Sequence, residues 1–444
     1  MTKLLQTIAI LSLLSLSACG PQTPAPKRIA EPVPEMILGE VDDEVSVVVD
    51  DDKSIKIAVL LPLSGPEAAL GASMLKAATL ALFDAYDPRI KLYPLDTGGR
   101  AEGARNAADQ AIELGAKVVV GPLLSGNIQA AGNILEIAGI PLIGFSSDST
   151  VARRGRYVMG FLPETEVSRV TSYAIDQGYL EFGALIPDSK YGELVRNAFG
   201  DAVYDGAAKI TAMQVYPNDP DNVQEPVKKI AQWDKRRKEV TSEVRALELL
   251  RDDVTDEIAE TLKDKEVISG PAFNAVLLPE GGALLRTLAP LLAYYEVDPN
   301  VVKLLGTGLW NDPTLLNEPP LRAGWFAGTD PTALRDFSRH YESIYDEPPA
   351  RIASIAYDSI GLIATLVREQ LDIDAIIINA ELIENQDGFS GVDGLFRFLS
   401  DGTIERALAI LEITPKGFKI VDPAQKAFPT FGFGLKQVSN TPNN

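Results

Sequence analysis

Residues 55–61 read IKIAVLL, a continuous apolar run of strand length, and the turn-forming segment PLSGP (62–66) follows it directly. We expect a helix from there to about residue 85. Uninterrupted apolar strands that alternate with helices are typical of a parallel sheet with helices on both faces. This opening unit therefore predicts an α/β fold.

The same alternation recurs in two series along the chain, which predicts two α/β lobes. In an open parallel sheet the ligand crevice lies at the carboxyl ends of the strands, so a site is expected just after each strand. The first series has strand-like segments at residues 90–95, 117–120 and 141–144, with helical segments at 101–114 and 125–138. The second series begins near residue 162, with strand-like segments at residues 182–187, 209–216, 273–278 and 302–306.

The side chains after these strands are polar, and many are hydroxyls. Hydroxyls and free amides at helix N-termini suit anionic or polar ligand groups, Glu280 could take a ligand ammonium, and Tyr191 could close over the ligand. Taken singly, each serine is more often a helix cap, and Tyr191 and Glu280 could equally be ordinary surface residues. The candidate ligand-binding residues are Ser64, Ser125, Ser146, Ser147, Asp148, Tyr191, Glu280 and Gly281.

The composition limits the class of partner. The chain has 444 residues, of which 46% are hydrophobic, enough for a core in each of two lobes. Its net charge of −21 disfavours nucleic acid and anionic lipid, and it leaves a basic partner or a cationic ligand open. Cys19 is the only cysteine, so internal disulfides are excluded.

The N-terminus has the features of an export signal. Lys3 precedes an apolar run, residues 4–16, that is too short to span a bilayer. The segment LSACG (16–20) resembles the lipobox of bacterial lipoproteins, which implies a signal peptide at residues 1–18 and a lipid on Cys19. An ordinary secretory signal or a buried N-terminal helix is the alternative. Gly20 after the cysteine resembles the pattern sent to the outer membrane, facing the periplasm; a cell with one membrane would keep the lipoprotein at its cell membrane.

Residues 19–53 are expected to form a lipid-anchored tether. The stretch is rich in proline and, towards its end, in aspartate and glutamate, so it favours an extended, self-repelling chain. Such a tether either lets the folded part reach a partner or serves only as a spacer. We expect no later segment to be apolar enough to cross a membrane, which leaves the lipid as the sole membrane anchor.

Three motifs together resemble the type I periplasmic binding proteins for branched-chain amino acids: AVLLPLSGP (58–66), PDSKYGE (187–193) and LPEG (278–281). The likeness extends over about residues 54–435. It implies two lobes joined by a hinge, with about three crossings near residues 160, 307 and 400. Lobe 1 would comprise residues 54–159 and 308–399, and lobe 2 residues 160–307 and 400–444.

A narrower resemblance concerns residues 273–295 (FNAVLLPEGGALLRTLAPLLAYY) and 390–398 (SGVDGLFRF). Together with the lipobox, these segments resemble the outer-membrane lipoprotein activators of class A penicillin-binding proteins. That resemblance implies a non-enzymatic protein that binds and stimulates a peptidoglycan synthase. The helical-repeat domain of that family's best-known members has no recognisable counterpart in this sequence. The alternative is therefore a solute-binding receptor of an ABC importer, for an amino-acid-like or other small polar ligand.

The resemblance also bears on the kind of ligand. In amino-acid receptors of this fold, the loop after the fourth strand offers hydroxyls to the ligand carboxylate. Asp148 stands in that loop at a position where a threonine would offer its hydroxyl to the ligand carboxylate. Because two carboxylates in a partly buried cleft repel each other strongly, a plain amino acid is not expected to fit. A basic or zwitterionic ligand with its carboxylate elsewhere is expected instead.

Residues 225–265 form a long charged connection within the second series. Basic residues cluster at 235–238 and acidic residues at 252–257. This length is unusual for a connection inside a compact lobe. The segment either projects as a helical arm for a protein partner or packs on its own lobe as an amphipathic helix. Apolar side chains recur at helical spacing at residues 247, 250, 254, 258 and 262.

No catalytic or cofactor motif stands out. His340, the single histidine, has no nucleophile or metal partner at a telling spacing. The sequence contains no G-x-x-x-x-G-K-[ST] loop, no cysteine–histidine cluster for zinc and no full dinucleotide fingerprint. Ser73 and Lys76 match S-x-x-K, but the partner motif K-T-G is absent and the match falls in a predicted core helix. We expect a non-enzymatic protein without cofactor or metal.

Overall fold

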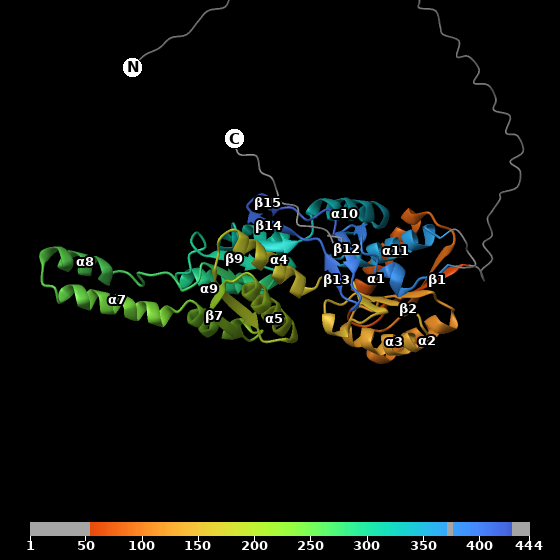
Figure 1. The fold of residues 1–444 in the computed structure, drawn as a ribbon, viewed down its shortest axis with the longest axis horizontal. Helices are drawn as coiled ribbons and strands as arrows, with labels where there is room; N and C mark the ends of the chain where they lie inside the picture. Colours follow the sequence, from red (N-terminus) through yellow and green to blue (C-terminus); the bar gives the residue numbers. More distant parts are fainter. Residues whose placement is uncertain (1–53, 371–375, 429–444) are drawn as a thin grey trace, which may run out of the picture. The chain divides into compact units, whose positions relative to one another are not determined.

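The computed structural model describes residues 54–370 and 376–428 (Figure 1). The predicted signal peptide, Cys19 and the tether up to residue 53 lie outside the described residues. Within the described part, two β-sheets with helices on both faces form two lobes, and a small third sheet joins the first lobe. The expected α/β fold with parallel sheets is confirmed.

The first lobe is built on a five-stranded parallel sheet of order β2-β1-β3-β4-β5. Every residue of β3, β4 and β5 is buried, as expected for strands that helices cover on both faces. The strands are β1 (Ile55–Leu61), β2 (Ile90–Asp96), β3 (Val118–Val120), β4 (Leu142–Gly144) and β5 (Arg156–Val158).

Two helix pairs cover this sheet. On one face α1 (Ala68–Ala85) packs against α11 (Ala353–Arg368), and on the other α2 (Ala101–Glu113) packs against α3 (Ser125–Ile137) (Figure 1). A further helix, α10 (Pro331–Tyr345), lies against α1, where the hydroxyls of Tyr341 and Ser73 are 3.3 Å apart. The buried face of α2 consists of alanines, whose small side chains let the helix approach the sheet closely.

The third sheet is antiparallel and has the order β11-β12-β13. Its side chains complete the core of the first lobe, where the ring of Phe398 lies 5.1 Å from that of Tyr157. The short helix α12 (Ala380–Ile383) precedes it. The strands are β11 (Phe389–Gly391), β12 (Gly394–Phe398) and β13 (Ile404–Arg406).

The second lobe is built on a seven-stranded sheet of order β15-β14-β10-β9-β8-β6-β7. Five strands are parallel, and β14 and β15 add an antiparallel edge. The strands are β6 (Glu181–Pro187), β7 (Lys209–Tyr216), β8 (Ala275–Leu277), β9 (Lys303–Gly306), β10 (Trp325–Gly328), β14 (Ala409–Thr414) and β15 (Gly417–Asp422).

Each face of this second sheet has its own apolar core. The helices α4 (Pro163–Asp176) and α5 (Lys190–Asp205) form one core with the sheet. The helices α6 (Gln224–Ile230) and α9 (Gly282–Tyr294) form the other. The lobe therefore has three layers, with the sheet in the middle.

The chain passes between the lobes after β5, after β10 and after β13. The crossing expected near residue 307 is wrong, because β10 (Trp325–Gly328) still pairs with β9 and β14 in the second sheet. Residues 308–321 form three short 3-10 turns that stay with the second lobe, so this lobe extends to residue 328. The third crossing lies between residues 406 and 409, slightly later than expected.

Among the described residues one helix, α1, is by length and composition alone apolar enough to cross a membrane. We expected no segment after the predicted signal peptide to be apolar enough to cross a membrane. By length and composition, that expectation is wrong. Met74, Ala77 and Ala81 of α1 are buried in the first-lobe core, and α1 pairs with α11. A core helix of a folded lobe passes the same test of length and composition.

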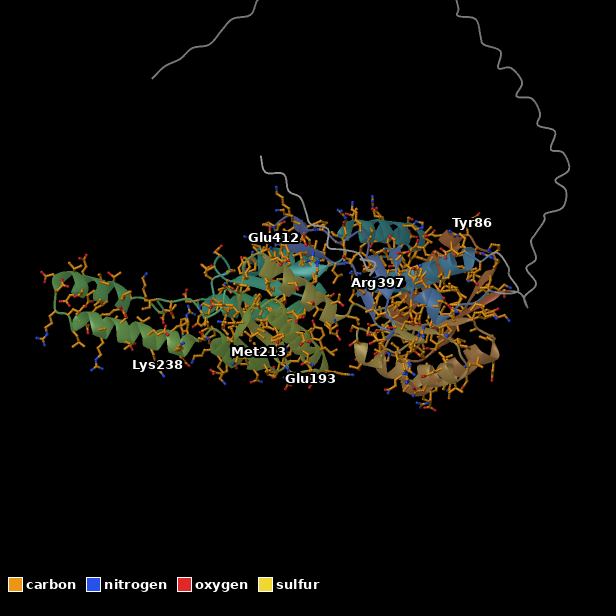
Figure 2. The ribbon with its side chains drawn as sticks, viewed as in Figure 1. Tyr86, Glu193, Met213, Lys238, Arg397 and Glu412 are labelled. Carbon is orange, nitrogen blue, oxygen red and sulfur yellow. The ribbon has the colours of Figure 1, made fainter. Side chains whose placement is uncertain are left out.

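The charged connection forms a helical hairpin of α7 (Trp233–Glu248) and α8 (Asp253–Lys263), which we call the arm. Figure 1 shows the two helices side by side, extending away from α9 and β7, and Figure 2 shows Lys238 on the arm. Of the two expectations for this segment, the structure shows the projecting arm.

Two features hold the arm together. Val240 of α7 and Ala259 of α8 are buried, and Lys263 pairs with Glu248 at 2.8 Å. At the base, the buried guanidinium of Arg236 donates hydrogen bonds to four carbonyl oxygens. These belong to Ser269 (2.8 Å), Glu296 (3.0 Å), Tyr295 (3.1 Å) and Ala231 (3.2 Å).

Candidate functional site

A cavity of about 450 Å³ lies where the strand ends of both lobes meet the crossing segments. Ser147, Arg351 and Ile352 come from the first lobe, and Tyr191, Gly308 and Leu309 come from the second. The crossings and the parts of the second lobe next to them contribute further residues. The remaining lining residues are Phe161, Pro163, Glu166, Asn311, Gly328 and Thr329.

Glu166, near the start of α4, supplies a buried carboxylate to this cavity. The residue is 7% exposed, and one carboxylate oxygen, Oε2, accepts a hydrogen bond from the backbone N–H of Gly308 at 2.9 Å. Burial raises the pKa of Glu166 to about 7, although the Gly308 hydrogen bond and the charges of Arg351 and Arg406 act to lower it. A Cβ at Gly308 would lie 2.4 Å from Oε1 of Glu166, so only glycine leaves room for this carboxylate.

Arg351 supplies a cationic group from the first lobe. Its Nη2 donates to Asp393 at 3.1 Å and to Thr329 at 3.3 Å, and its side chain remains 36% exposed. Its guanidinium also lies 4.8 Å from the centroid of the Phe161 ring, a cation–π contact. Asp393 is fully buried, so this ion pair fixes the position of the arginine.

Tyr191, the second residue of α5, lines the cavity from the second lobe, whereas Arg351 lines it from the first. Its hydroxyl lies 3.1 Å from that of Thr307, which follows β9. Burial raises the pKa of Tyr191 above its usual range, and the nearby carboxylates of Glu166 and Glu280 add to this effect. The phenol therefore stays neutral and serves as a hydrogen-bonding and apolar wall.

The structure places two of the eight candidate residues, Ser147 and Tyr191, in the lining of this cavity. Gly281 packs behind the wall, because a Cβ there would lie 3.1 Å from the Cβ of Leu309. Glu280 is engaged elsewhere: it accepts hydrogen bonds from the Tyr216 hydroxyl at 2.8 Å and from the N–H of Gly281 at 3.0 Å.

The other serines serve local structure. Ser64 and Leu63 donate their backbone N–H groups to Asp96, at 3.2 and 2.8 Å. Ser125 is the first residue of α3, whose N-cap is Leu124, so it does not cap that helix. The hydroxyl of Ser146 accepts a hydrogen bond from the N–H of Asp148 at 3.0 Å.

Asp148 forms an ion pair with Lys190 of the second lobe at 2.7 Å. Burial acts to raise the pKa of Asp148, but hydrogen bonds from Lys190 and Thr150 outweigh it and hold the pKa below its usual value. Asp148 is also absent from the residues that line the cavity. The expected repulsion between this carboxylate and a ligand is therefore wrong, because its charge is neutralised by a lysine that sequence reasoning did not consider.

Sequence reasoning missed Glu166, Arg351 and Phe161. An acidic residue in the first turn of a helix is usually explained by the helix dipole, so Glu166 carried no distinct signal. Gly306, the last residue of β9, and Gly308 lie on either side of Thr307, and this was a usable signal, since paired glycines point to a close approach. Arg351 follows two prolines in a loop, where nothing marks it as a ligand-binding residue.

The groups considered for catalysis make structural contacts. Ser73 accepts a hydrogen bond from the N–H of Ala350 at 2.9 Å, and Lys76 pairs with Glu347 at 2.7 Å. His340 lies 3.2 Å from Asp84 on the surface. Within residues 54–370 and 376–428, no group of three or more histidine, cysteine, aspartate or glutamate side chains could hold a metal ion.

Two lobes around a lined cavity define a class of fold, and comparisons with known proteins agree with this fold class. Residues 54–234 match the model of a family described as periplasmic binding proteins. A relative in Rickettsia prowazekii, the uncharacterised protein RP748, is 23% identical over 190 residues. That match covers 43% of this chain and 51% of RP748, so the chain spans about half the length of this curated relative.

Solved structures show the same fold at low identity. An ABC transporter substrate-binding protein from Sphaerobacter thermophilus has a TM-score of 0.63 at 19% identity, covering 84% of this chain and 99% of its own. A branched-chain amino acid ABC transporter ligand-binding protein from Burkholderia xenovorans has a TM-score of 0.61 at 14% identity, covering 84% and 95%. LivJ from Streptococcus pneumoniae, in complex with isoleucine, has a TM-score of 0.53 at 18% identity, covering 83% and 100%. The chain has the two-lobed fold of type I periplasmic binding proteins.

Proposed function

We propose that this protein is a non-enzymatic solute-binding receptor of an ABC importer, for an amino-acid-like or other small polar ligand. One observation carries the proposal: the cavity of about 450 Å³ is lined from both lobes and by charged groups of opposite sign, Glu166 and Arg351. Clefts of this size with a few convergent polar groups suit small ligands. The solved neighbours, which include amino acid binding proteins, support the same class.

A metabolite screen by thermal unfolding tests this function. A ligand present at 100 times its Kd should stabilise the folded protein by about 2.7 kcal/mol, which raises the Tm measurably. Ser147→Trp places a large side chain at an exposed position on the cavity wall, so the variant should fold normally and lose the ligand-dependent shift. Glu193→Gln, an exposed change on α5, is the matched control and should keep the shift. If no metabolite stabilises the wild-type protein, the receptor function is wrong.

We also propose that the protein is exported and anchored by a lipid on Cys19, in the outer membrane facing the periplasm, or in the cell membrane if the cell has only one. The lipobox-like segment LSACG supports this location. Labelling cells with a clickable fatty acid should tag the wild-type protein and leave Cys19→Ala unlabelled. Equal labelling of both proteins, or labelling of neither, would contradict the anchor.

The second candidate function is a contact with a class A penicillin-binding protein, which the resemblance of residues 273–295 and 390–398 implies. The arm favours it, because its tip exposes Leu249, Leu250 and Val254 at 70%, 66% and 64%. Exposed apolar clusters of this kind often mark protein contacts. Purified synthase should bind the wild-type protein and not Leu250→Asp, while Lys238→Gln on the same arm should still bind. Absence of any complex with the wild-type protein would remove this candidate.

A further inference from the structure

We infer that the ligand is a small zwitterion whose cationic group is received by Glu166, rather than by Glu280, and whose anionic group is received by Arg351. This inference rests on the proposed receptor function and names the ligand class and the residues that recognise it. From the sequence, Glu280, which follows β8, was a candidate for binding the cationic group.

Glu280 is unsuited to that role because its carboxylate is already engaged. Oε2 accepts the Tyr216 hydroxyl at 2.8 Å, and Oε1 accepts the N–H of Gly281 at 3.0 Å. Glu280 is also not among the residues that line the cavity. A ligand ammonium would have to displace one of these hydrogen bonds in order to reach it.

Glu166 lines the cavity and has one carboxylate oxygen to spare. Oε2 accepts the N–H of Gly308, whereas Oε1 has no hydrogen-bond donor among the described residues. A buried carboxylate with one hydrogen bond is poorly compensated when it is ionised. A cationic ligand group at Oε1 would provide the missing charge and a charge-assisted hydrogen bond.

The charged neighbours of Glu166 compensate its charge only in part, since burial still raises its pKa to about 7. Arg351, from the loop before α11, pairs with Asp393, and Arg406, at the end of β13, donates to the carbonyl of Met159 at 2.7 Å. The hydroxyl of Tyr191, on α5, lies 3.1 Å from that of Thr307, and Glu164, on α4 with Glu166, brings no positive charge. Burial accordingly keeps the pKa of Glu166 near 7, where a bound cation would displace its proton.

Arg351 faces the same cavity with part of its hydrogen-bonding capacity free. Nη2 donates hydrogen bonds to Asp393 and Thr329, and Nη1 donates a long one of 3.4 Å to Ser354. Nε has no hydrogen-bond partner among the described residues. A carboxylate is the planar anion that a guanidinium binds best. The exposed hydroxyl of Ser147 lines the cavity and comes from the same lobe.

Part of the cavity lining is apolar. Phe161, Pro163, Leu309 and Ile352 form this part, so the body of the ligand should be hydrocarbon. The anionic end would be held by the first lobe and the cationic end by the second. Such a ligand favours the arrangement in which both lobes contact it, since it gains both interactions only there.

Isothermal titration calorimetry with two matched sets tests this inference. One set is leucine, 4-methylpentanoate and 3-methylbutylamine, and the other is phenylalanine, 3-phenylpropanoate and phenethylamine. Within each set only the charged groups differ. At least one amino acid should bind the wild-type protein, and its acid and amine should bind about 10- to 100-fold more weakly, the usual effect of losing a charge-assisted hydrogen bond. Glu166→Gln should weaken the amino acid by a similar factor, whereas Glu280→Gln and Glu193→Gln should bind it nearly as well as the wild type.

Proton release provides a second readout that a purely structural role of Glu166 would not produce. Near pH 7, titrations in buffers of different ionisation heat should show that the wild-type protein releases protons on binding, and that Glu166→Gln does not. The inference is overturned if the acid binds as tightly as the amino acid, if Glu280→Gln rather than Glu166→Gln loses affinity, or if neither amino acid binds. If neither amino acid binds but the metabolite screen finds a ligand of another chemical class, the receptor function is retained and only the zwitterion inference is wrong. If the screen finds no ligand at all, the receptor function and the inference are both wrong.

Discussion

At the scale of single residues, two buried carboxyl groups have pKa values well above the usual range. Glu166 lines the cavity, and Asp358 of α11 accepts hydrogen bonds from the N–H groups of Val392 and Asp393 at 2.7 and 3.3 Å. Burial raises the pKa of each to about 7, and the charge of Asp393 adds to the effect at Asp358. Both groups therefore change charge in the neutral range instead of near pH 4.

Glu166→Gln should remove a pH-dependent loss of stability. Because the pKa of Glu166 rises from 4.5 to about 7 on folding, the folded state holds the proton more tightly than the unfolded state. The free energy of unfolding therefore falls as the pH rises from about 4.5 through 7. The loss is on the order of 3 kcal/mol at pH 8, so the variant should be more stable than the wild type there and similar to it at pH 5.

Urea unfolding at pH 5 and pH 8 measures this difference. Asp358 contributes a similar slope to both proteins, so the comparison between variant and wild type isolates Glu166. Glu193→Gln, which changes an exposed carboxylate, should follow the wild type at both pH values. Parallel pH slopes in the wild type and in Glu166→Gln would contradict the account of this residue.

Part of the site could be predicted from sequence at this scale. Ser147 and Tyr191 were found because they directly follow strands, and the ends of parallel strands converge in any fold of this kind. Glu166 and Arg351 come from a helix turn and a loop beside the crossings, so their proximity depends on how the lobes are joined. The pairing of Asp148 with Lys190 likewise joins residues of two lobes, and no local pattern predicts it.

At the scale of elements, the strands with long apolar runs were predicted and a short one was missed. The runs in β1 and β6 are buried almost throughout, and their length of seven residues favours a strand over a helix. WFAG in β10 has only four residues and follows three short 3-10 turns, which break the alternation of strands and helices. Missing β10 is the reason that the second crossing was placed about twenty residues too early.

Arg236→Met should loosen the arm from the second lobe. The guanidinium of Arg236 is buried and donates to four backbone carbonyls, which the variant would leave without these donors. Loss of such hydrogen bonds costs about 3 kcal/mol, and the effect should be confined to the arm and its neighbours. Hydrogen exchange should become faster in α7, α8 and the residues around Tyr295, while the strands of the first lobe remain protected.

Lys238→Met, two residues further along α7, is the matched control. Its ammonium is exposed on the arm, so its removal should leave the exchange pattern unchanged (Figure 2). Equal protection of the arm in Arg236→Met and the wild type would show that this arginine does not anchor it.

At the scale of the whole molecule, residues of the first and third crossings and an arginine of the first lobe meet around one aromatic ring. Phe161 belongs to the first crossing, and the guanidinium groups of Arg351 and Arg406 lie 4.8 and 4.9 Å from its ring centroid. Arg406 ends the strand before the third crossing. The ion pair between Asp148 and Lys190 adds a tie between the lobes away from the crossings.

Lys190→Met should weaken the binding of anionic and zwitterionic ligands. The change leaves the charge of Asp148 uncompensated near the cavity, and its repulsion of a ligand carboxylate is worth roughly 1 kcal/mol, or about fivefold in Kd. The loss of the ion pair itself should cost the folded protein only about 0.5 kcal/mol, since Lys190 is largely exposed.

Calorimetry at low and high salt distinguishes this effect from general damage. The loss of affinity in Lys190→Met should shrink at high salt, because ions screen the repulsion. Lys209→Met, at an exposed position in the same lobe, should bind like the wild type. An equal loss in both variants would argue against a specific role for the pair.

The central claim is that the cavity between the lobes is the ligand site. A crystal structure of the protein with the ligand that stabilises it most in the metabolite screen tests this directly. The account predicts ligand density between Arg351 and Glu166, in contact with Ser147 and Tyr191. Ligand density on any other surface, with this cavity left without ligand, would contradict it.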